Sequence, residues 1–389
     1  MPPKNRFAEL QSEITGWRRH LHENPELLFD CHETAAFVEA RLKEFGVDSI
    51  ETGVAQTGVV AVIKGKTNTT GKTIALRADM DALPILEDTG LEYASKTPGK
   101  MHACGHDGHT SMLLGAAKYL AETRNFDGTC VLLFQPAEEG GGGGKVMVDE
   151  GVMDKYNVDE VYGMHNWPGH EVGSFAIRTG AFFAAADQFH ITVKGLGGHA
   201  AKPNECIDTT VIASHMVVAL QTIASRNVDP VKQVVVSVTS FETESKAHNV
   251  IPETVTLRGT VRTLDTGVQD QVEARFKAIC EGIATTFGGS VDVQYTRGYP
   301  VMVNAEEQTK FAADVARSVS GNCDDNAALI MGGEDFAFMS NARPGAYILV
   351  GNGTDGAMVH HPKYNFNDET LPAGCSWYAE IVEKGMPAA

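Results

Sequence analysis

The sequence predicts an α/β fold, in which a mostly parallel sheet is flanked by helices and interrupted by an inserted domain. Three observations lead to this prediction. In residues 1–185 short apolar segments alternate with amphipathic ones, as strands and helices do in layered α/β proteins. Near Ala185 the order changes to β-α-β-β-α-β. After Pro300 the first pattern returns, so we expect one α/β domain that is cut by an insertion and then resumed.

The first part, residues 1–185, begins with two amphipathic segments, Phe7–Asn24 and Thr34–Phe45. Apolar residues recur at helical spacing in both, and Gly46 ends the second. The later elements expected here are strands at Gly58–Lys64, Lys72–Arg77, Thr129–Gln135 and Asp159–His165, and helices at about Thr110–Thr123 and Lys145–Glu150. The strands are short and strongly apolar, which is typical of parallel strands buried on both faces.

Residues 186–298 are expected to form the inserted domain. Its first strand, Gln188–Lys194, alternates apolar and polar residues, as a half-exposed strand does. The elements that follow are a helix at Cys206–Ser225, strands at Gln233–Ser240 and Glu253–Arg262, a helix at Gly267–Phe287 and a strand at Ser290–Thr296. This order is that of the ferredoxin-like βαββαβ fold.

The last part, residues 299–389, resumes the α/β domain. Its expected elements are a helix at Glu307–Ser318, a strand at Gly345–Val350 and a closing helix at Thr370–Glu383. The chain is therefore expected to hold two domains, one of them made of two separate stretches of sequence.

Composition limits the possible partners. The 389 residues include 50 acidic and 32 basic side chains, a net charge of −18, which argues against nucleic-acid binding and against docking on anionic membranes. No apolar run reaches the roughly 18–20 residues that span a bilayer, and the segment 1–6 lacks the apolar stretch of a secretory signal. The seven scattered cysteines do not form a disulfide framework, so we expect a cytoplasmic protein.

Chemically active side chains follow the predicted strands of the first domain. They are Asp79 and Asp81, Glu138 and Glu139, His165 at the end of its strand, His360 and His361, and the segment 101–109 with Cys104 and His106 just before a helix. In open α/β sheets, ligands bind beyond the carboxyl ends of the strands. The five segments therefore bring the ligand types of a transition-metal site to one edge of one sheet.

The number of candidate ligands suggests two metal ions. Cys104, His106, Glu139, His165 and one of His360 and His361 are too many for one open tetrahedral site. Two metals could share them, with a water between the metals. Glu138 would then be free to act as the general base that deprotonates the water and later protonates the leaving amine. These residues alone leave open which glutamate binds metal.

A set of motifs spans nearly the whole chain. They lie at 18–22, 25–27, 76–84, 101–110, 135–140, 163–165, 197–203, 249–253, 259–262, 332–337 and 360–362. In this order they resemble the M20 metallopeptidase clan, specifically its amidohydrolase subfamily. That subfamily contains hippurate hydrolases, bacterial N-acyl-amino-acid amidohydrolases and plant auxin-conjugate hydrolases.

The resemblance implies a zinc-peptidase-like catalytic domain that holds two divalent metal ions per subunit. Zinc or manganese is expected, with nickel or cobalt as alternatives. The residues carried over are the metal ligands Cys104, His106, Glu139, His165 and His360, the general base Glu138, and Asp81 as a residue that supports the site. His360 is preferred to His361 because the ligand of the family is the first residue of a His-x-Pro stretch.

The resemblance also implies that the inserted domain is a lid and dimerisation domain. His199 matches a residue that reaches the active site of the partner subunit and can stabilise an oxyanion there. Asn249 and Arg262 are candidates for holding the carboxylate of the substrate or the oxyanion, although Arg262 has an equally good structural role between strands. Gly333 offers a backbone N–H near the substrate. A homodimer, or a tetramer built from dimers, is expected.

Together these features predict a metal-dependent amidohydrolase that cleaves N-acyl-amino acids, such as hippurate-like, N-acetyl or indole-acyl conjugates. The rivals are a dedicated N-acetyl-diaminopimelate-type deacetylase, a dipeptidase, and a non-catalytic metal-binding sensor. A sensor needs ligands but no base, so Glu138 argues against it. A nucleotide-binding Gly-x-Gly-x-x-Ala pattern at 195–200 is weak, because Pro203 interrupts the helix that should follow.

One departure from the family concerns the segment after Glu139. Five glycines run from Gly140 to Gly144, and Lys145 follows where relatives usually have a small residue. We expect this segment to change the flexibility of the loop or one wall of the pocket.

Overall fold

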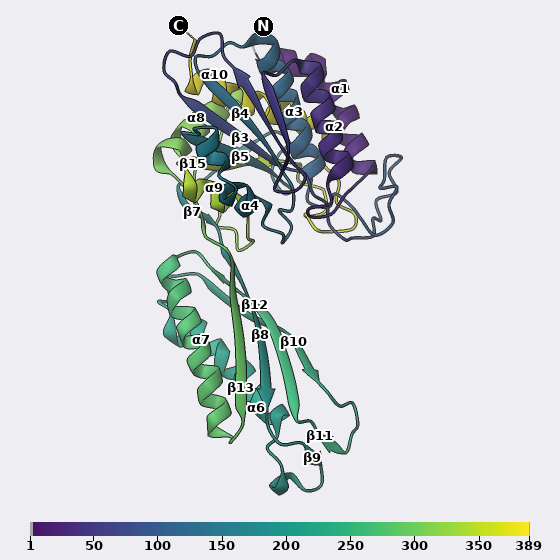
Figure 1. Ribbon diagram of the computed structural model, residues 1–389, viewed down its shortest axis with the longest axis vertical. Coiled ribbons are helices and arrows are strands. Elements are labelled where there is room, and N and C mark those ends of the chain that lie inside the picture. Colours follow the sequence, from purple (N-terminus) through teal and green to yellow (C-terminus); the bar gives the residue numbers. More distant parts are fainter. Residues whose placement is uncertain (1–2, 389) are drawn as a thin grey trace. The chain divides into compact units, whose positions relative to one another are not determined.

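The computed structural model describes residues 3–388, which form two compact units (Figure 1). The first unit contains the residues up to Gly180, residues 303–328, and the residues from Asp335 onward. The second contains residues 181–302 and 329–334. Each unit has its own hydrophobic core. The predicted α/β fold is confirmed.

The first unit is built on a seven-stranded sheet with the order β1-β2-β4-β3-β5-β15-β6. Its strands are β1 (Ser49–Val54), β2 (Gly58–Lys64), β3 (Thr73–Asp79), β4 (Thr129–Gln135), β5 (Glu160–Trp167), β6 (Phe175–Ala176) and β15 (Gly345–Gly351). The four inner strands run parallel, whereas β1, β2 and β6 pair antiparallel with their neighbours. The parallel strands are almost wholly buried, as their apolar sequences predicted.

Helices cover both faces of this sheet. They are α1 (Pro3–Glu23), α2 (His32–Phe45), α3 (His106–Thr123), α4 (Gly143–Asp149), α5 (Val152–Lys155), α8 (Glu306–Ser320), α9 (Phe336–Ala342) and α10 (Leu371–Gly385). The large hydrophobic core joins α1, α2, α3, α8 and α10 to alternate residues of the sheet, such as Ile74 and Leu76. Arg77 directly follows Leu76 in β3, so its side chain points to the opposite face, where α4 and α9 pack.

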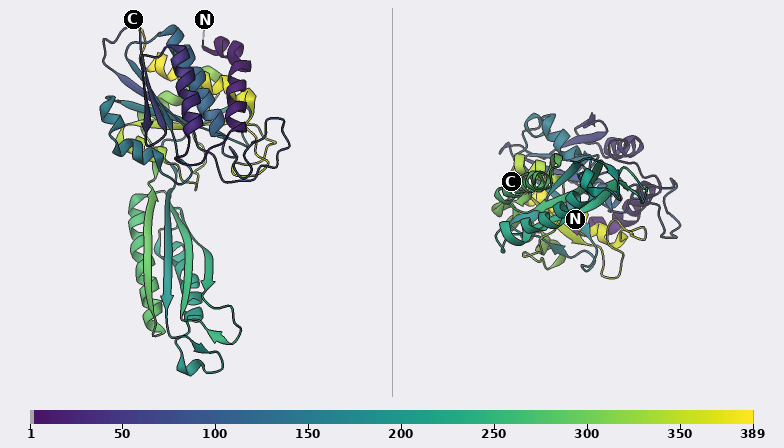
Figure 2. Two further views of the ribbon diagram at one scale, coloured as in Figure 1. Left: turned by 45° about the vertical axis from the view of Figure 1, so that its right-hand side comes forward. Right: turned by 90° about the horizontal axis from the view of Figure 1, so that it is seen from below.

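The second unit contains a four-stranded antiparallel sheet with the order β10-β12-β8-β13. Its main elements are β8 (Ala185–Lys194), α6 (Thr209–Thr222) with a π-helical turn (Ile223–Asn227), β10 (Val234–Thr243), β12 (Thr254–Thr263), α7 (Thr266–Thr286) and β13 (Ser290–Tyr299). Figures 1 and 2 show α6 and α7 on the same face of this sheet, where they enclose its core. The order agrees with the predicted βαββαβ pattern.

The start of α6 differs from the prediction, which placed it at Cys206. The carboxylate of Asp208 accepts hydrogen bonds from the backbone N–H groups of Thr210 and Val211, so the helix begins at Thr209. The residues before it form a short 3-10 turn at Pro203–Glu205. Two short strands, β9 (Gly198–His199) and β11 (Val250–Ile251), pair with each other at one end of this unit.

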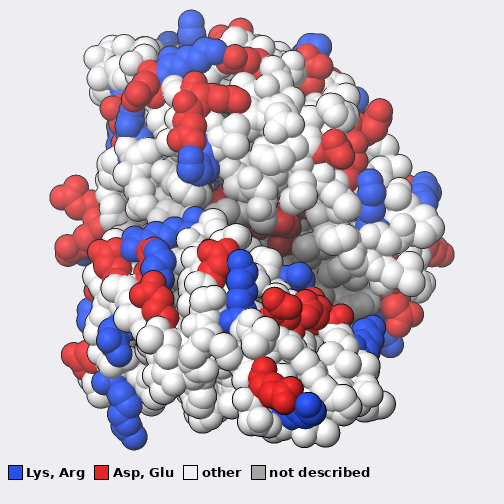
Figure 3. All heavy atoms as spheres, turned by 60° about the horizontal axis from the view of Figure 1, so that its bottom comes forward, with Lys and Arg blue, Asp and Glu red and all other residues white. Residues whose placement is uncertain are grey.

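Charged residues are mixed over the surface. On the face drawn in Figure 3, acidic and basic side chains are interspersed, and none of the basic groups visible there form a continuous stripe. Within residues 3–388, no helix combines the length and the hydropathy that crossing a bilayer requires.

Candidate metal centre

The carboxyl ends of the parallel strands lie together at one edge of the seven-stranded sheet. Asp79 ends β3, the pair Glu138–Glu139 follows β4, and His165 lies near the end of β5. His360 lies in the long loop that follows β15. The sheet topology therefore brings together side chains that are far apart in sequence, as the carboxyl-edge rule predicts.

The turn before α3 contributes Cys104 and His106. Gly105 has a φ of +89°, and a Cβ atom there would lie 2.3 Å from the side-chain nitrogen of Asn166. Only glycine accommodates both the left-handed backbone and this close approach. The turn consequently packs directly against the end of β5, where Cys104 Sγ lies 3.3 Å from His165 Nε2.

Two overlapping groups of side chains could each hold a metal ion. In one, the ligand atoms of Cys104, His106 and His165 lie within 4.8 Å of one another, and in the other the same is true of Cys104, Glu139 and His360. Cys104 belongs to both groups. The ligand atoms of His106, Glu138 and Glu139 also lie within 4.8 Å of one another. Thiol, imidazole and carboxylate donors in this number fit a pair of transition-metal ions.

The orientation of the imidazole rings fits metal binding as well. His106 Nδ1 donates to the backbone oxygen of Asp81 at 2.8 Å, and Nε2 is buried with no hydrogen-bond partner among the described residues. His165 Nδ1 donates to the backbone oxygen of Asn166 at 2.6 Å. In both rings a backbone carbonyl fixes the tautomer in which Nε2 presents its lone pair to the cluster.

The electrostatics of the cluster favour a cation. Burial, with the nearby Glu139 and Glu138, raises the pKa of Cys104 well above its usual range. Burial lowers the pKa of His106, but Asp79 and Asp81 outweigh it and raise the pKa to about 10. Burial raises the pKa of Asp81. Anionic groups therefore crowd a buried space, and a bound cation would relieve their mutual repulsion.

Asp81 connects the two glutamates to His106. Its carboxylate accepts hydrogen bonds from the backbone N–H groups of Glu138 at 2.9 Å and of Glu139 at 3.1 Å. Ala137 just before them has a φ of +57°, a left-handed conformation that costs energy for any residue other than glycine. Asp81 thus holds a strained turn that directs both glutamates, which fits the supporting role predicted for it.

A buried network behind the cluster was not foreseen from the sequence. Both oxygens of Asp79 accept hydrogen bonds, one from Arg77 Nη1 at 2.7 Å and one from His109 Nδ1 at 2.6 Å. His109 Nε2 accepts from the backbone N–H of Asn166 at 2.9 Å. Both nitrogens of His109 are therefore engaged, and Asp79 and His109 support the cluster from behind.

Arg77 extends this network across the sheet. Its Nη2 donates to Asp335 Oδ1 at 2.8 Å, and its Nε donates to Gln135 Oε1 at 2.9 Å. Asp335 also accepts from the side chain of Gln135 and from the backbone N–H of Gly144. The signal that could have indicated this role is the position of Arg77, a charged residue in the middle of an apolar strand.

The glycine run has a structural explanation. Gly140 and Gly142 have φ values of +98° and +69°, and a Cβ atom at Gly143 would lie 1.7 Å from the backbone oxygen of Pro136. The glycines thus form a closely packed turn into α4. Lys145 is exposed and pairs with Asp149 one helical turn away.

The four candidate site residues of the second unit lie in two pairs, His199 with Asn249 and Arg262 with Gly333. His199 lies in β9. The backbone N–H of Ala200, the residue after His199, donates a hydrogen bond to the backbone oxygen of Asn249 at 3.0 Å. Arg262 pairs with Ala186 in the sheet, and a Cβ atom at Gly333 would lie 2.8 Å from Ala186 Cβ.

These two pairs lie at opposite ends of the four-stranded sheet. The short strands with His199 adjoin the end of β12 at Thr254, eight residues (262 − 254) from Arg262. At about 3.3 Å per strand residue, the two ends of β12 are about 26 Å apart. One inserted unit therefore cannot present all four residues to one small molecule.

The α/β fold and the set of metal-binding side chains are those of a metal-dependent hydrolase. A comparison with protein-family models gives a more specific result. The model described as peptidase family M20/M25/M40 matches residues 75–384, and the chain belongs to this family.

Individual relatives agree over almost the full length. The chain is 43% identical to a hippurate hydrolase of Campylobacter jejuni, over 97% of this chain and 98% of the relative. It is also 43% identical to an N-acetyl-L-cysteine deacetylase of Bacillus subtilis, over 96% of this chain and 88% of the relative. Among solved structures, a dinuclear metal-binding peptidase of the M20 family from Bacillus subtilis matches with a TM-score of 0.85 and 32% identity, covering 98% of this chain and 100% of that one.

A buried ion pair near the centre gives a prediction for pH. His22 Nδ1 lies 2.8 Å from Asp107 Oδ2, and Nε2 lies 3.3 Å from Glu87 Oε1. Burial lowers the pKa of His22, but these two carboxylates outweigh it and raise the pKa to about 9 from 6.5. The stabilisation of the folded state by protonated His22 is therefore complete below pH 6.5 and is lost as the pH rises through 9.

We expect the free energy of unfolding to fall by about 3 kcal/mol between pH 6.5 and pH 9 through this residue. Urea unfolding at the two pH values, for the wild type and for His22→Asn, measures the effect. The variant should lose most of the difference between the two pH values. Equal pH dependence in both proteins would contradict the prediction.

Proposed function

We propose that the chain is a dinuclear metal-dependent amidohydrolase that cleaves N-acyl-amino acids into a carboxylate and a free amino acid. Cys104, His106, Glu139, His165 and His360 would hold two divalent metal ions, zinc or manganese, with nickel or cobalt as alternatives. The main support is that Cys104 is common to the group with His106 and His165 and to the group with Glu139 and His360, with Glu138 near them. The names of the relatives, a hippurate hydrolase and an N-acetyl-L-cysteine deacetylase, support the substrate class.

When bound, the metal ions would polarise the amide carbonyl and lower the pKa of the attacking water. Glu138, a buried residue that the cluster does not need as a ligand, would take a proton from this water. The same carboxyl group would then give the proton to the nitrogen of the departing amino acid. Asp81 would keep Glu138 in place through the hydrogen bond to its backbone N–H.

The second unit would act as a lid and as the dimer interface. Arg262 would bind the carboxylate of the substrate, with Gly333 nearby, and His199 and Asn249 would act on the active site of the partner subunit. The distance between the two pairs along β12 supports this division. Val211 and Val218 are exposed on α6, and Val235 is exposed on β10, the edge strand of the sheet, so an apolar surface is available for a second copy.

A reducing compartment such as the cytoplasm fits the protein, because all seven cysteines are free thiols. The substrate would be a small molecule that is present in that compartment.

Release of amino acids from N-acetyl, N-benzoyl and indole-acyl amino acids tests the function, with metal content measured on the same samples. We expect near two metals per chain, and release that stops with a chelator and returns with Zn²⁺ or Mn²⁺. N-acetyl-diaminopimelate and dipeptides in the same series test the two rival hydrolases. Metal binding without release from any substrate would instead indicate a sensor.

The shared active site gives a prediction for mixed dimers. His199→Ala and Glu138→Gln should each inactivate the homodimer, since one loses the oxyanion donor and the other the base. A mixed dimer of the two variants should regain up to half of the wild-type activity, because one of its two sites has an intact Glu138 and an intact His199. Co-expression with two affinity tags allows the mixed dimer to be purified and assayed.

Substitution in the proposed interface provides the control. Val218→Glu should produce monomers in light scattering and lower kcat, since His199 would then be missing from every site. Leu86→Glu is the matched variant, because Leu86 in the first unit is 69% exposed and Val218 is 71% exposed. A Val218→Glu protein that stays dimeric, or mixed dimers without activity, would contradict the shared site.

A further inference from the structure

The motif at residues 18–22 lies in α1, outside the metal centre, yet two of its basic residues are buried. Arg18 and His22 are both fully buried, with 0% exposure. Burying a guanidinium group is costly unless it is paired and hydrogen-bonded. The partners of Arg18 therefore show what the motif does.

Arg18 contacts two segments that border the metal centre. Its Nε donates to Asp368 Oδ1 at 2.7 Å, and its Nη1 lies 3.5 Å from Asp107 Oδ2. Asp107 directly follows His106 in the first turn of α3. Asp368 directly follows the loop that comes after β15 and contains His360. The side chain of Arg18 thus joins the helix turn that follows His106 to the end of the loop that contains His360.

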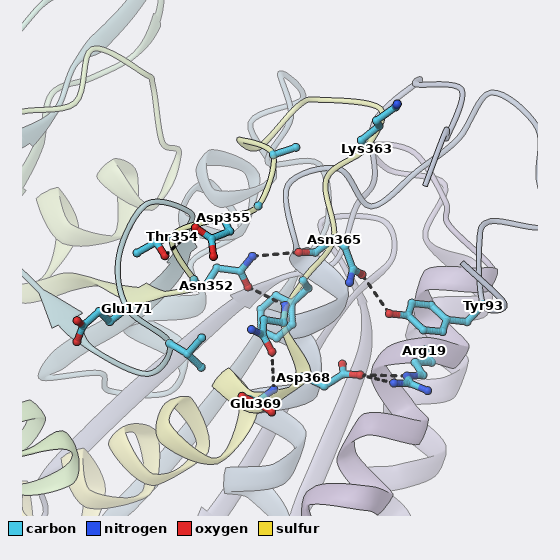
Figure 4. Close-up of a pocket in the computed structure, with 16 residues that line it drawn as sticks. Arg19, Tyr93, Glu171, Asn352, Thr354, Asp355, Lys363, Asn365, Asp368 and Glu369 are labelled. Carbon is cyan, nitrogen blue, oxygen red and sulfur yellow. Dashed lines mark hydrogen bonds and ion pairs between the residues drawn. The ribbon is translucent and has the colours of Figure 1, made fainter. Parts of the chain in front are cut away.

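The loop with His360 needs such an attachment. It extends from 352 to 367, which is 16 residues (367 − 352 + 1), and loops longer than about 12–15 residues are uncommon. His360 itself has a φ of +67° and a side chain that is 53% exposed, and its backbone N–H donates to the oxygen of Ala103 at 2.7 Å, so packing alone does not fix its side chain. Figure 4 shows Asn352 bonded to Asn365 and Arg19 bonded to Asp368 at the base of this loop.

The loop at 84–100 strengthens the same attachment. The ring of Tyr93 lies against both guanidinium groups, with centroid distances of 4.6 Å to Arg18 and 4.4 Å to Arg19. The Tyr93 hydroxyl donates to Asn365 Oδ1 at 3.3 Å, as Figure 4 shows. The backbone N–H of Asp88 donates to the oxygen of Pro362, two residues after His360, at 2.8 Å.

We propose that Arg18 is a positioning residue of the metal centre, which fixes the spacing between His106 and His360 by binding Asp107 and Asp368 together. This inference rests on the proposed function, because it assumes that both histidines are metal ligands. Arg18 itself touches neither the metals nor the substrate. Its removal should loosen the loop with His360 and weaken metal binding while the fold is retained.

The adjacent residue provides a matched control. Arg19 also binds Asp368, at 3.0 and 2.8 Å, but its side chain is 47% exposed and, among the described residues, it forms no ion pair with Asp107. Arg18→Gln and Arg19→Gln therefore remove the same charge from neighbouring positions. Asp368→Asn weakens the attachment from the loop side, at a partly exposed residue, and serves if Arg18→Gln does not fold.

The experiment measures Zn²⁺ affinity by competition with a chromophoric chelator, the absorption bands of the Co²⁺-loaded protein, and the melting temperature without metal. Arg18→Gln and Asp368→Asn should bind Zn²⁺ about 10–100-fold more weakly, with shifted Co²⁺ bands. Arg19→Gln should stay close to the wild type. A merely structural role would lower the melting temperature and leave the affinity and the bands unchanged.

Two outcomes separate the failure of this inference from the failure of the proposed function. Folded Arg18→Gln and Asp368→Asn proteins with wild-type affinity and wild-type Co²⁺ bands would overturn the positioning role alone. A wild-type protein that binds no Zn²⁺ and no Co²⁺ would overturn the proposed function, and the positioning role with it.

Discussion

Glu138→Gln is expected to retain both metal ions and to lose about 10²–10⁴-fold in kcat, the usual contribution of a general base. The substitution keeps the size of the side chain and the backbone N–H that donates to Asp81. It removes the carboxylate that would accept the proton of the water. Metal content by elemental analysis and kcat for the best N-acyl-amino acid check the prediction.

The neighbouring glutamate gives the contrasting variant. Glu139 lies 3.2 Å from His360 and belongs to one of the two ligand groups. Burial raises the pKa of Glu139, but His360 and His106 outweigh it and keep the carboxyl ionised. Glu139→Gln should therefore lose metal as well as activity. If Glu138→Gln also lost its metals, or hydrolysed amides at the parental rate, the assignment of the base would be wrong.

The sequence predicted those parts of the fold that local patterns determine. The strands β2, β3, β4 and β15 were foreseen to within a few residues, because each is a short apolar run bounded by polar or turn residues. The position of the cluster was foreseen from the rule that ligands gather at the carboxyl ends of parallel strands. The choice of Glu139 over Glu138 and of His360 over His361 as ligands depended on the family resemblance, and the geometry brings the candidate ligands together.

Long-range pairing explains what was not predicted. The ion pairs of Arg77 with Asp335 and of Arg18 with Asp368 join residues that are 258 and 350 positions apart, and no local pattern indicates either partner. The left-handed backbone of Ala137 was not predicted either, since alanine rarely adopts it. The close packing at Gly143 was not predicted, because a glycine in the sequence is equally typical of a flexible loop and of a tightly packed turn.

Cys104→Ala is expected to bring the metal content from near two per chain to one or fewer. The reason is geometric, since Cys104 is common to the group with His106 and His165 and to the group with Glu139 and His360. Activity should fall by more than the 10–100-fold that the loss of an outer hydrogen-bond partner of a metal site typically costs. Elemental analysis and the kcat of the metal-reconstituted protein measure the two effects.

A second buried cysteine separates ligation from packing. Cys130 in β4 is also buried, and its pKa is raised by burial alone, so Cys130→Ala removes a thiol of the same size without touching the cluster. It should bind two metals and keep its activity, with some loss of stability from the cavity. Equal metal content in both variants would mean that Cys104 is a packing residue. The four remaining donors would then have to form a centre in which no thiolate takes part.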